Sequence, residues 1–247
     1  MRLTVLGGGG AYPTPERGCS GYLVEHAGFR LLLDPGYATL PALLEHVDAA
    51  AIDAVFVSHS HGDHCADLNP LLRIRHLDPD PPPPLPVFAL PGATDSIMAL
   101  DADMNLADNA DVHEFDSGAE LTVGPFTLHT ASLSHFVDNT GVRIESGGYS
   151  LVYSGDGGAD PALRDLAAQA SVLLTEATFV EDVPSHSRGS LASAGLAAEH
   201  ADRAGVGRLV LTHLWPGTEP RAAARSARRR YAGPLDVARP GLTVDVR

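Results

Sequence analysis

The sequence contains no lysine: its 17 Lys and Arg residues are all arginines. This absence excludes mechanisms that need a lysine amine, such as a Schiff base, a pyridoxal anchor or a P-loop. The four glycines at positions 7–10 are therefore not a Walker loop, since the Lys-Ser/Thr pair that would follow them is also missing.

Long hydrophobic runs and cysteines are scarce as well. No stretch of about 18 apolar residues is present, and the apolar part of the N-terminus is too short for a signal peptide. The two cysteines, Cys19 and Cys65, do not make a disulfide framework. We therefore expect a cytoplasmic protein with no membrane partner.

Basic residues are few compared with acidic ones. The 17 arginines face 31 acidic residues, which gives a formal net charge of -14 over 247 residues. This balance argues against a surface that grips nucleic acid over its whole extent, because such binding draws on many basic contacts to phosphates. One basic helical stretch remains, which we interpret as a solvated face: Arg221, Arg225, Arg228, Arg229 and Arg230.

Hydrophobic patterns predict a strand-rich first part followed by alternating helices and strands. We expect strands at residues 3–6, 21–25, 30–34, 54–58, 87–90, 112–115, 126–131, 142–145, 149–154, 172–175 and 208–212, and helices at 37–46, 65–74, 93–106, 161–169, 191–204 and 219–231. No repeat and no long linker is visible, so residues 1–247 are expected to form one domain. This order fits two sheets with helices outside them.

The strongest motif is His-Ser-His-Gly-Asp-His at residues 59–64, directly after an apolar strand. Alternate residues of an extended loop point the same way, so His59 and His61 can meet one metal ion. Asp63 and His64 stand where the chain turns into a helix and can face a second ion. Imidazole nitrogens and carboxylate oxygens are suitable ligands for zinc, manganese or iron.

The motif resembles the His-x-His-x-Asp-His signature of the metallo-β-lactamase superfamily, and the resemblance spans nearly the whole chain. It implies an αββα sandwich and two divalent ions, with zinc the first expectation and manganese or iron as alternatives. His129 could replace the third histidine of the set, but it stands inside an expected strand. The ligands implied by the resemblance are His59, His61 and His135 for one ion, Asp63, His64 and His213 for the other, and Asp156 as the bridge.

A closer resemblance is to ribonuclease Z. Residues 11–17 are similar to its opening loop, and Thr-Glu-Ala-Thr-Phe at 175–179 resembles its His-Glu-Ala-Thr segment, with threonine replacing histidine. The resemblance implies that His186 reaches the scissile phosphate and that Glu176 orients it. Asp63 would then be both a metal ligand and a proton acceptor.

The chain departs from ribonuclease Z between the third histidine and the bridging aspartate. His135 and Asp156 are only 21 residues apart, which leaves room for one hairpin and none for the long arm that grips transfer RNA in that group. Smaller armless relatives are phosphodiesterases. We therefore expect a small phosphodiester substrate, such as a cyclic nucleotide, and do not expect transfer RNA to be one.

Several alternatives stay open at this stage. A ribonuclease Z-like endonuclease, a lactone or thioester hydrolase, and a non-enzymatic metal-binding protein share the scaffold. Arg143 and Arg188 could hold phosphate oxygens or form structural salt bridges. Trp215 could stack on a base or pack at the rim. The sequence also leaves a homodimer open.

Overall fold

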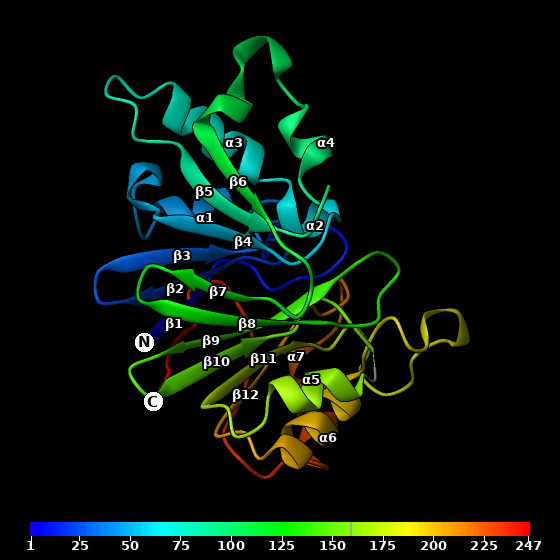
Figure 1. Cartoon of the computed structure of the whole chain (residues 1–247). Coiled ribbons are helices and arrows are strands. Elements are labelled where there is room, and N and C mark those ends of the chain that lie inside the picture. Colours follow the sequence, from blue (N-terminus) through cyan, green and yellow to red (C-terminus); the bar gives the residue numbers. More distant parts are fainter. Residues whose placement is uncertain (159) are drawn as a thin grey trace.

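The computed structural model describes residues 1–158 and 160–247. In this part of the chain two mixed sheets pack face to face, and helices cover the outer face of each (Figure 1). This is the αββα sandwich that the sequence predicted. Strands with both faces covered should be apolar throughout, as in β4 (Ala54–Val57), where every residue is buried.

The first sheet has the strand order β14-β1-β2-β3-β4-β5-β6. Its members are β1 (Arg2–Val5), β2 (Tyr22–His26), β3 (Phe29–Leu33), β4, β5 (Leu85–Ala89), β6 (Ala110–Glu114) and β14 (Thr243–Asp245). The pairs from β14 to β3 are antiparallel, and those from β3 to β6 are parallel. The carboxyl ends of the parallel strands therefore share one edge.

The second sheet has the order β13-β12-β11-β10-β9-β8-β7. Its members are β7 (Glu120–Val123), β8 (Phe126–Ser132), β9 (Thr140–Ser146), β10 (Tyr149–Tyr153), β11 (Val172–Glu176), β12 (Leu209–Thr212) and β13 (Leu235–Val237). Pairs from β7 to β10 are antiparallel, and those from β10 to β13 are parallel. Each sheet thus has one antiparallel and one parallel half.

The helices divide between the two outer faces in chain order (Figure 1). On the first sheet lie α1 (Leu40–Leu44), α2 (Gly62–Cys65), α3 (Leu68–His76) and α4 (Asp95–Met98). On the second lie α5 (Pro161–Leu166), α6 (Ala194–Ala204) and α7 (Pro220–Arg228). No helix in the described residues combines the length and the hydropathy that crossing a bilayer requires.

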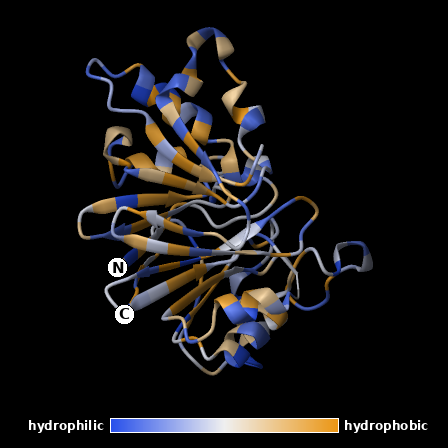
Figure 2. Ribbon diagram, in the orientation of Figure 1, coloured by the Kyte–Doolittle hydropathy of each residue, from blue (hydrophilic) through white to orange (hydrophobic). Residues whose placement is uncertain are grey.

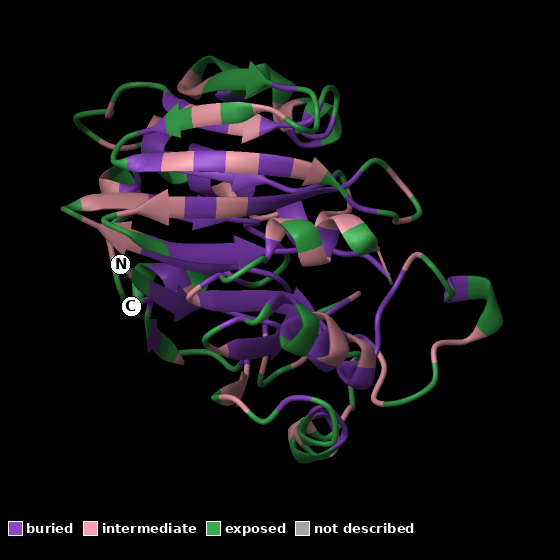
Figure 3. Cartoon of the chain, turned by 60° about the horizontal axis from the view of Figure 1, so that its bottom comes forward, coloured by how far each residue is buried: buried purple, intermediate pink, exposed green. Residues whose placement is uncertain are grey.

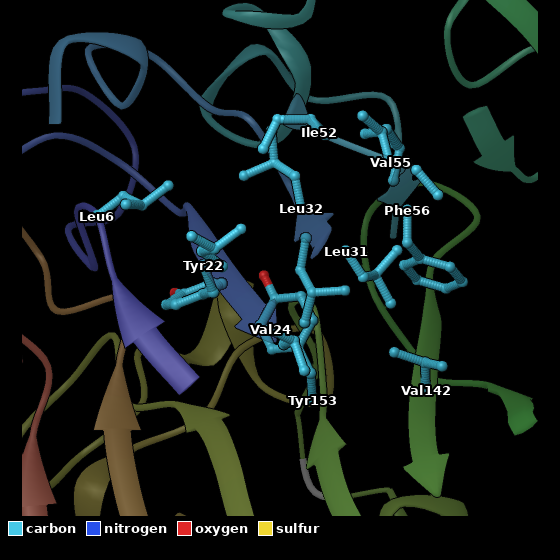
Figure 4. Packing of buried hydrophobic residues seen from close by; sticks show 14 of the residues in the cluster. Leu6, Tyr22, Val24, Leu31, Leu32, Ile52, Val55, Phe56, Val142 and Tyr153 are labelled. Atoms are coloured by element: carbon cyan, nitrogen blue, oxygen red, sulfur yellow. The ribbon is translucent and has the colours of Figure 1, made fainter. Parts of the chain in front are cut away.

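The main core lies between the sheets, where apolar strands face one another (Figures 2 and 4). Strand β10 is buried on both faces. Leu151 and Tyr153 belong to this core, while Val152 packs toward the helices of the second sheet. Tyr153 meets Tyr22 of the opposite sheet with ring centroids 5.0 Å apart. The central strands are almost entirely buried, and exposure is concentrated at loops, at outer helices and on the edge strand β6 (Figure 3).

The structure corrects several expected elements. The helix predicted at 93–106 is broken into α4 and two 3₁₀ turns, because Asp101 and Asn105 adopt left-handed backbone conformations with φ of 51°. The helix predicted at 65–74 is two helices, α2 and α3. Strands β7, β13 and β14 have no counterpart in the sequence prediction. They are short, and whether such a segment forms a strand depends on the neighbouring strands with which it pairs.

Candidate metal centre

The predicted metal ligands gather where strands of both sheets end. The motif at 59–64 follows β4, His135 follows β8, Asp156 follows β10 and His213 follows β12. The Gly62–Cys65 helix turns Asp63 and His64 inward, as the sequence predicted, and both are buried. Side chains at strand ends are held by the sheet behind them, which gives a site rigid support.

The first group of ligands consists of His59, His61 and His135. His61 Nδ1 lies 3.1 Å from His59 Nε2 and 3.2 Å from His135 Nε2. Burial lowers the pKa of His59 and of His135, so their imidazoles stay neutral and keep a free lone pair. Three ring nitrogens that converge in this way cannot all satisfy one another, but they can share one cation.

The second group consists of Asp63, His64 and His213. Asp63 Oδ2 lies 3.2 Å from His213 Nε2 and 3.7 Å from His64 Nε2. Burial alone would raise the pKa of Asp63, but its hydrogen bond with His213 and the charge of His64 hold that pKa well below its usual range. The carboxylate is therefore ionised, which is the form that binds a metal.

Asp156 lies between the two groups. Its Oδ2 is 3.7 Å from His135 Nε2 and 3.2 Å from His213 Nε2, and its Oδ1 is 3.3 Å from His64 Nε2. One carboxylate thus faces ligands of both groups. This is the position that a bridge between two ions requires.

Two buried polar atoms at this centre test whether metal ions fit it. His64 Nε2 and Asp156 Oδ1 lie 3.3 Å apart but make no hydrogen bond, either to one another or to any other atom of the described residues. Leaving such atoms unpaired costs about 1–3 kcal/mol each. Divalent ions bound by imidazole nitrogens and carboxylate oxygens would satisfy both, so the residues present fit a metal pair.

Asp34, which the sequence analysis overlooked, supports two of the ligands. Its Oδ2 accepts a hydrogen bond from His64 Nδ1 at 2.8 Å and from the Ser58 hydroxyl at 2.6 Å. The Ser58 oxygen lies 3.0 Å from His59 Nδ1, so Asp34 also reaches that ring. A carboxylate behind a ligating imidazole fixes its tautomer and raises its basicity. The available signal was a buried acidic residue at the end of β3, beside the strand that carries the histidine motif.

His213 is held in an unusual backbone conformation, with φ of 55°. Its Nδ1 lies 2.9 Å from the Thr178 hydroxyl, which donates to Glu176 Oε2. Gly10 packs against the ring so closely that a Cβ there would lie 2.6 Å from Nδ1. The glycine run at 7–10 therefore includes a place where the chain must pass beside a metal ligand.

His135 rather than His129 occupies the site. His135 Nδ1 is 2.8 Å from the Ser190 carbonyl oxygen, which leaves Nε2 facing the other ligands. His129 sits on β8, 3.4 Å from Glu120 and 3.7 Å from Glu145. The preference for His135 over the strand histidine agrees with this placement.

Glu176 is buried at the centre, but it does not contact His186. Its Oε1 accepts hydrogen bonds from the backbone N–H groups of Gly157 and Ala192, at 2.8 Å and 3.0 Å. Burial beside Asp156 raises the pKa of Glu176 to about 8. Glu176 thus holds the segment after Asp156 in place and, through Thr178, the ring of His213.

The structure does not bring His186 together with the other predicted residues. It lies on an exposed 3₁₀ turn, Ser185–Ser187, whose loop projects from the molecule (Figures 1 and 3). Its predicted contact with phosphate stays a prediction. The same loop ends at Ser190 and Ala192, so it is anchored to the centre through His135 and Glu176.

The remaining candidates fall into different places. Arg143 donates to Glu145, to the Ser150 hydroxyl and to two carbonyl oxygens, so it forms a structural network rather than a free phosphate site. Arg188 is exposed on the His186 loop. Trp215 is 45% exposed just beyond His213. Cys65 is buried, and its Sγ contacts the carbonyl oxygens of Ser60 and His61 at 3.6 Å and 3.2 Å.

Comparisons with known sequences agree with this geometry. A family model described as "Beta-lactamase superfamily domain" matches residues 29–214. The chain is 33% identical to the protein Rv1339 of Mycobacterium tuberculosis, with 100% of this chain and 93% of that protein covered. It is 29% identical to the probable metallo-hydrolase YhfI of Bacillus subtilis (98% and 98%) and 31% identical to a ribonuclease Z of Mycobacterium bovis (96% and 95%).

Solved structures give the same result for the fold. The metallo-β-lactamase-fold protein YhfI of Bacillus subtilis superposes with a TM-score of 0.89 and 28% identity over 99% of both chains. Human tRNase Z, short form, superposes with a TM-score of 0.79 and 23% identity over 100% of both. A diphosphatase from the PhnP family gives 0.76 at 17% identity, covering 100% of this chain and 98% of the other.

Proposed function

The chain belongs to the β-lactamase superfamily, and we propose that it is a two-metal hydrolase of small phosphodiesters, cyclic nucleotides included. The observation that carries the proposal is Asp156, whose two oxygens face ligands of both groups. Two ions held by one carboxylate suit in-line displacement at phosphorus. Relatives and neighbours named ribonuclease Z, tRNase Z and diphosphatase are named for bonds to phosphorus, which supports the same reaction class.

Metal ions bound here would supply positive charge for the phosphate oxygens and would lower the pKa of a bound water toward neutrality. The protein's own part is to fix the ligands and to handle the proton. The Asp63 carboxylate is oriented by a hydrogen bond of 2.8 Å from the Ala11 backbone N–H to Oδ2, and we assign to this carboxylate the role of accepting the proton of the attacking water. Asp34 and Thr178 hold the rings of His64 and His213 in the tautomer that this arrangement needs.

The short segment between His135 and Asp156 favours small substrates, because it leaves no room for an RNA-binding arm. Strands β9 and β10 fill this interval as one antiparallel hairpin, paired from Tyr149–Ser146 to Tyr153–Val142. A large RNA needs contacts far from the metals, and its association is opposed by a net charge of -14. A small diester carries a single charge that the metal pair can hold.

The test is a panel of diesters given to protein reconstituted with manganese or zinc. It should contain 2′,3′- and 3′,5′-cyclic nucleotides, bis(p-nitrophenyl) phosphate, a lactone and a thioester. We expect turnover of phosphodiesters, with metal content near two per chain. Hydrolysis of the lactone or thioester with no diester cleaved would overturn the proposal, as would less than half an equivalent of metal after reconstitution.

A second candidate is endonucleolytic processing of transfer RNA precursors. It is favoured by the Mycobacterium bovis ribonuclease Z, which the chain matches over 95% of that protein's length at 31% identity. The two candidates are separated by kcat/KM for a cyclic nucleotide and for a transfer RNA precursor in one buffer. We expect the cyclic nucleotide to have the higher value, and the opposite result would promote this candidate.

A further inference from the structure

A pocket of about 450 Å³ has in its lining Leu214 and Trp215, which directly follow the predicted ligand His213. One wall is the segment at 9–17, and the other is the segment at 214–218. The side chains that matter below are Tyr12, Glu16, Arg17 and Trp215. None of them is among the metal ligands or their supporting partners.

The pocket walls are continuous with two ligands of the second group. The Ala11 backbone N–H, next to Tyr12, donates to Asp63 Oδ2 at 2.8 Å. On the other side, Trp215 follows His213 by two residues, and Gly10 N donates to the Leu214 carbonyl at 3.1 Å. The two walls therefore offer a surface for an ester group that extends from a phosphate at the centre.

Two aromatic side chains of the pocket are unusually exposed. Tyr12 is 54% exposed and Trp215 45%, and their rings meet edge to face with centroids 6.4 Å apart. Aromatic rings normally bury most of their surface, so exposed pairs that line a pocket indicate a binding surface. Their apolar faces suit a planar group that stacks on them.

A charged side chain completes the pocket. The guanidinium of Arg17 makes no hydrogen bond and no ion pair within residues 1–158 and 160–247, although its stem packs on Gly9. A half-buried guanidinium that has no protein partner is ready to donate to a ligand. Glu16, beside it, lines the same pocket and offers an acceptor.

We propose that this pocket binds the aromatic group of the phosphodiester substrate. The planar ring packs against Tyr12 and Trp215, and Arg17 donates to an acceptor atom of that ring system or to an oxygen of the phosphate. This inference rests on the proposed function and names its substrate class: phosphodiesters that carry a nucleobase or another aromatic ring. The pocket then gives specificity, while the metal centre gives reactivity.

Trp215 supplies a direct readout of binding because it is the only tryptophan of the chain. Metal-loaded protein is titrated with adenosine 5′-monophosphate and, separately, with ribose 5-phosphate, while tryptophan fluorescence is followed. We expect the nucleotide to quench the emission at concentrations about tenfold to a hundredfold lower than the ribose phosphate. Tyr12→Leu and Arg17→Gln should each weaken nucleotide binding, whereas Tyr149→Leu, an exposed aromatic at the start of β10, should not.

A kinetic arm separates the kinds of aromatic group. Wild type, Trp215→Leu and Tyr149→Leu are compared on a 2′,3′-cyclic nucleotide, on bis(p-nitrophenyl) phosphate and on the 2′,3′-cyclic phosphate of an abasic ribose. We expect Trp215→Leu to lower kcat/KM for the first substrate by about tenfold or more and to leave the abasic substrate unchanged. A matching loss on the aryl diester means that any aromatic ring is accepted, and a loss on the nucleotide alone means that a nucleobase is required.

The two proposals fail in different ways. Equal binding of nucleotide and ribose phosphate, together with turnover of the abasic diester, would overturn the pocket and leave the phosphodiesterase intact. Nucleotide-specific quenching with no diester cleaved would overturn the proposed function alone. If Tyr12→Leu or Trp215→Leu instead changes the sedimentation of the protein and leaves nucleotide affinity unchanged, the pocket is an interface between copies and this inference is wrong.

Discussion

The two ligand groups differ in how firmly the protein holds them. In the second group every ligand is buried and has a partner behind it: Asp63 with the Ala11 N–H, His64 with Asp34, and His213 with Thr178. In the first group His61 and His135 are only partly buried, and no side-chain partner is found behind His61 in the described residues. His135 is supported by a carbonyl oxygen from the loop that carries His186.

This difference gives the two groups different expected roles. Carboxylates behind imidazoles raise their basicity and fix their orientation, so the second group should hold its ion more tightly. In the first group His61 is only partly buried and His135 rests on a projecting loop, which suits the exchange of substrate and product. The following experiments test this contrast.

The largest effect on metal content and activity is expected at Asp156, because this carboxylate faces ligands of both groups. Asp156→Asn keeps the shape of the side chain and removes the charge that both groups share. We expect the loss of both ions and a fall in kcat of about 10³-fold or more. Metal analysis and diester hydrolysis measure the two effects, with exposed Asp48→Asn as the control. A variant that keeps two ions would show that the bridge is not needed.

A smaller effect is expected on the side of the first group. His186→Ala should lower kcat by about 10²-fold if the loop delivers this imidazole to the phosphate, and should leave the metal content unchanged. Exposed His46→Ala is the matched control. A wild-type rate in His186→Ala would remove His186 from the reaction and limit the loop to its support of His135.

The second group is tested at Asp34. Asp34→Asn removes the carboxylate that contacts His64 directly and reaches His59 only through Ser58. It should weaken binding of the second group's ion by about tenfold to a hundredfold and binding of the first group's ion by less. Tyr153→Phe is the matched control, because it deletes the hydroxyl that donates to Asp34 at 2.6 Å and leaves the carboxylate on His64. Competition with a fluorescent chelator gives both affinities. If Tyr153→Phe weakens the ion as much as Asp34→Asn does, the carboxylate is not the support.

Staged metal removal compares the groups in the unaltered protein. We expect one equivalent of metal to dissociate at least about tenfold faster than the other. Thr178→Val should reduce the difference between the two dissociation rates, since it removes the hydroxyl behind His213. Stopped-flow release into a chelator measures both rates. Two equal rates in wild-type protein would contradict the contrast.

The smallest effect is expected at Cys19. Burial raises the pKa of its thiol to about 12, and the charges of Asp63 and Asp67 act in the same direction. Because this pKa is higher in the folded than in the unfolded protein, the neutral thiol contributes to stability below the unfolded pKa. That contribution is lost as the pH rises toward about 12. At pH 8 the thiol of the folded protein is therefore neutral. We expect no reaction of native protein with Ellman's reagent at pH 8 and reaction of both cysteines after unfolding. Rapid native labelling would show that this part of the structure opens.

Part of the centre could be predicted from the residues themselves, while His135, Asp156 and His213 were implied by the resemblance to the metallo-β-lactamase superfamily. The motif at 59–64 is local, and alternation within an extended loop is enough to pair His59 with His61. The role of Asp34 could not be predicted from a local motif, since it depends on β3 lying beside β4 with Leu33 opposite Phe56. Glu176 was predicted as the residue that orients His186, which it does not contact. Its contact with His213 through Thr178 could not be predicted, because Thr178 and His213 meet only when β11 and β12 pair.

By itself the sequence predicted the strand-rich order of the chain and two sheets with helices outside them, since periodicity carries that information. The local motif at 59–64 also carried the family resemblance that implied the set of seven ligands. Only the tertiary structure decided that His186 is exposed and that Asp34 and Thr178 stand behind the ligands. It also brought Tyr12 and Trp215, about two hundred residues apart in the chain, to one pocket. The physical reason is that hydrogen bonds to a ring's second nitrogen, and rings that share a pocket, come from neighbouring strands and loops, whose proximity no local pattern encodes.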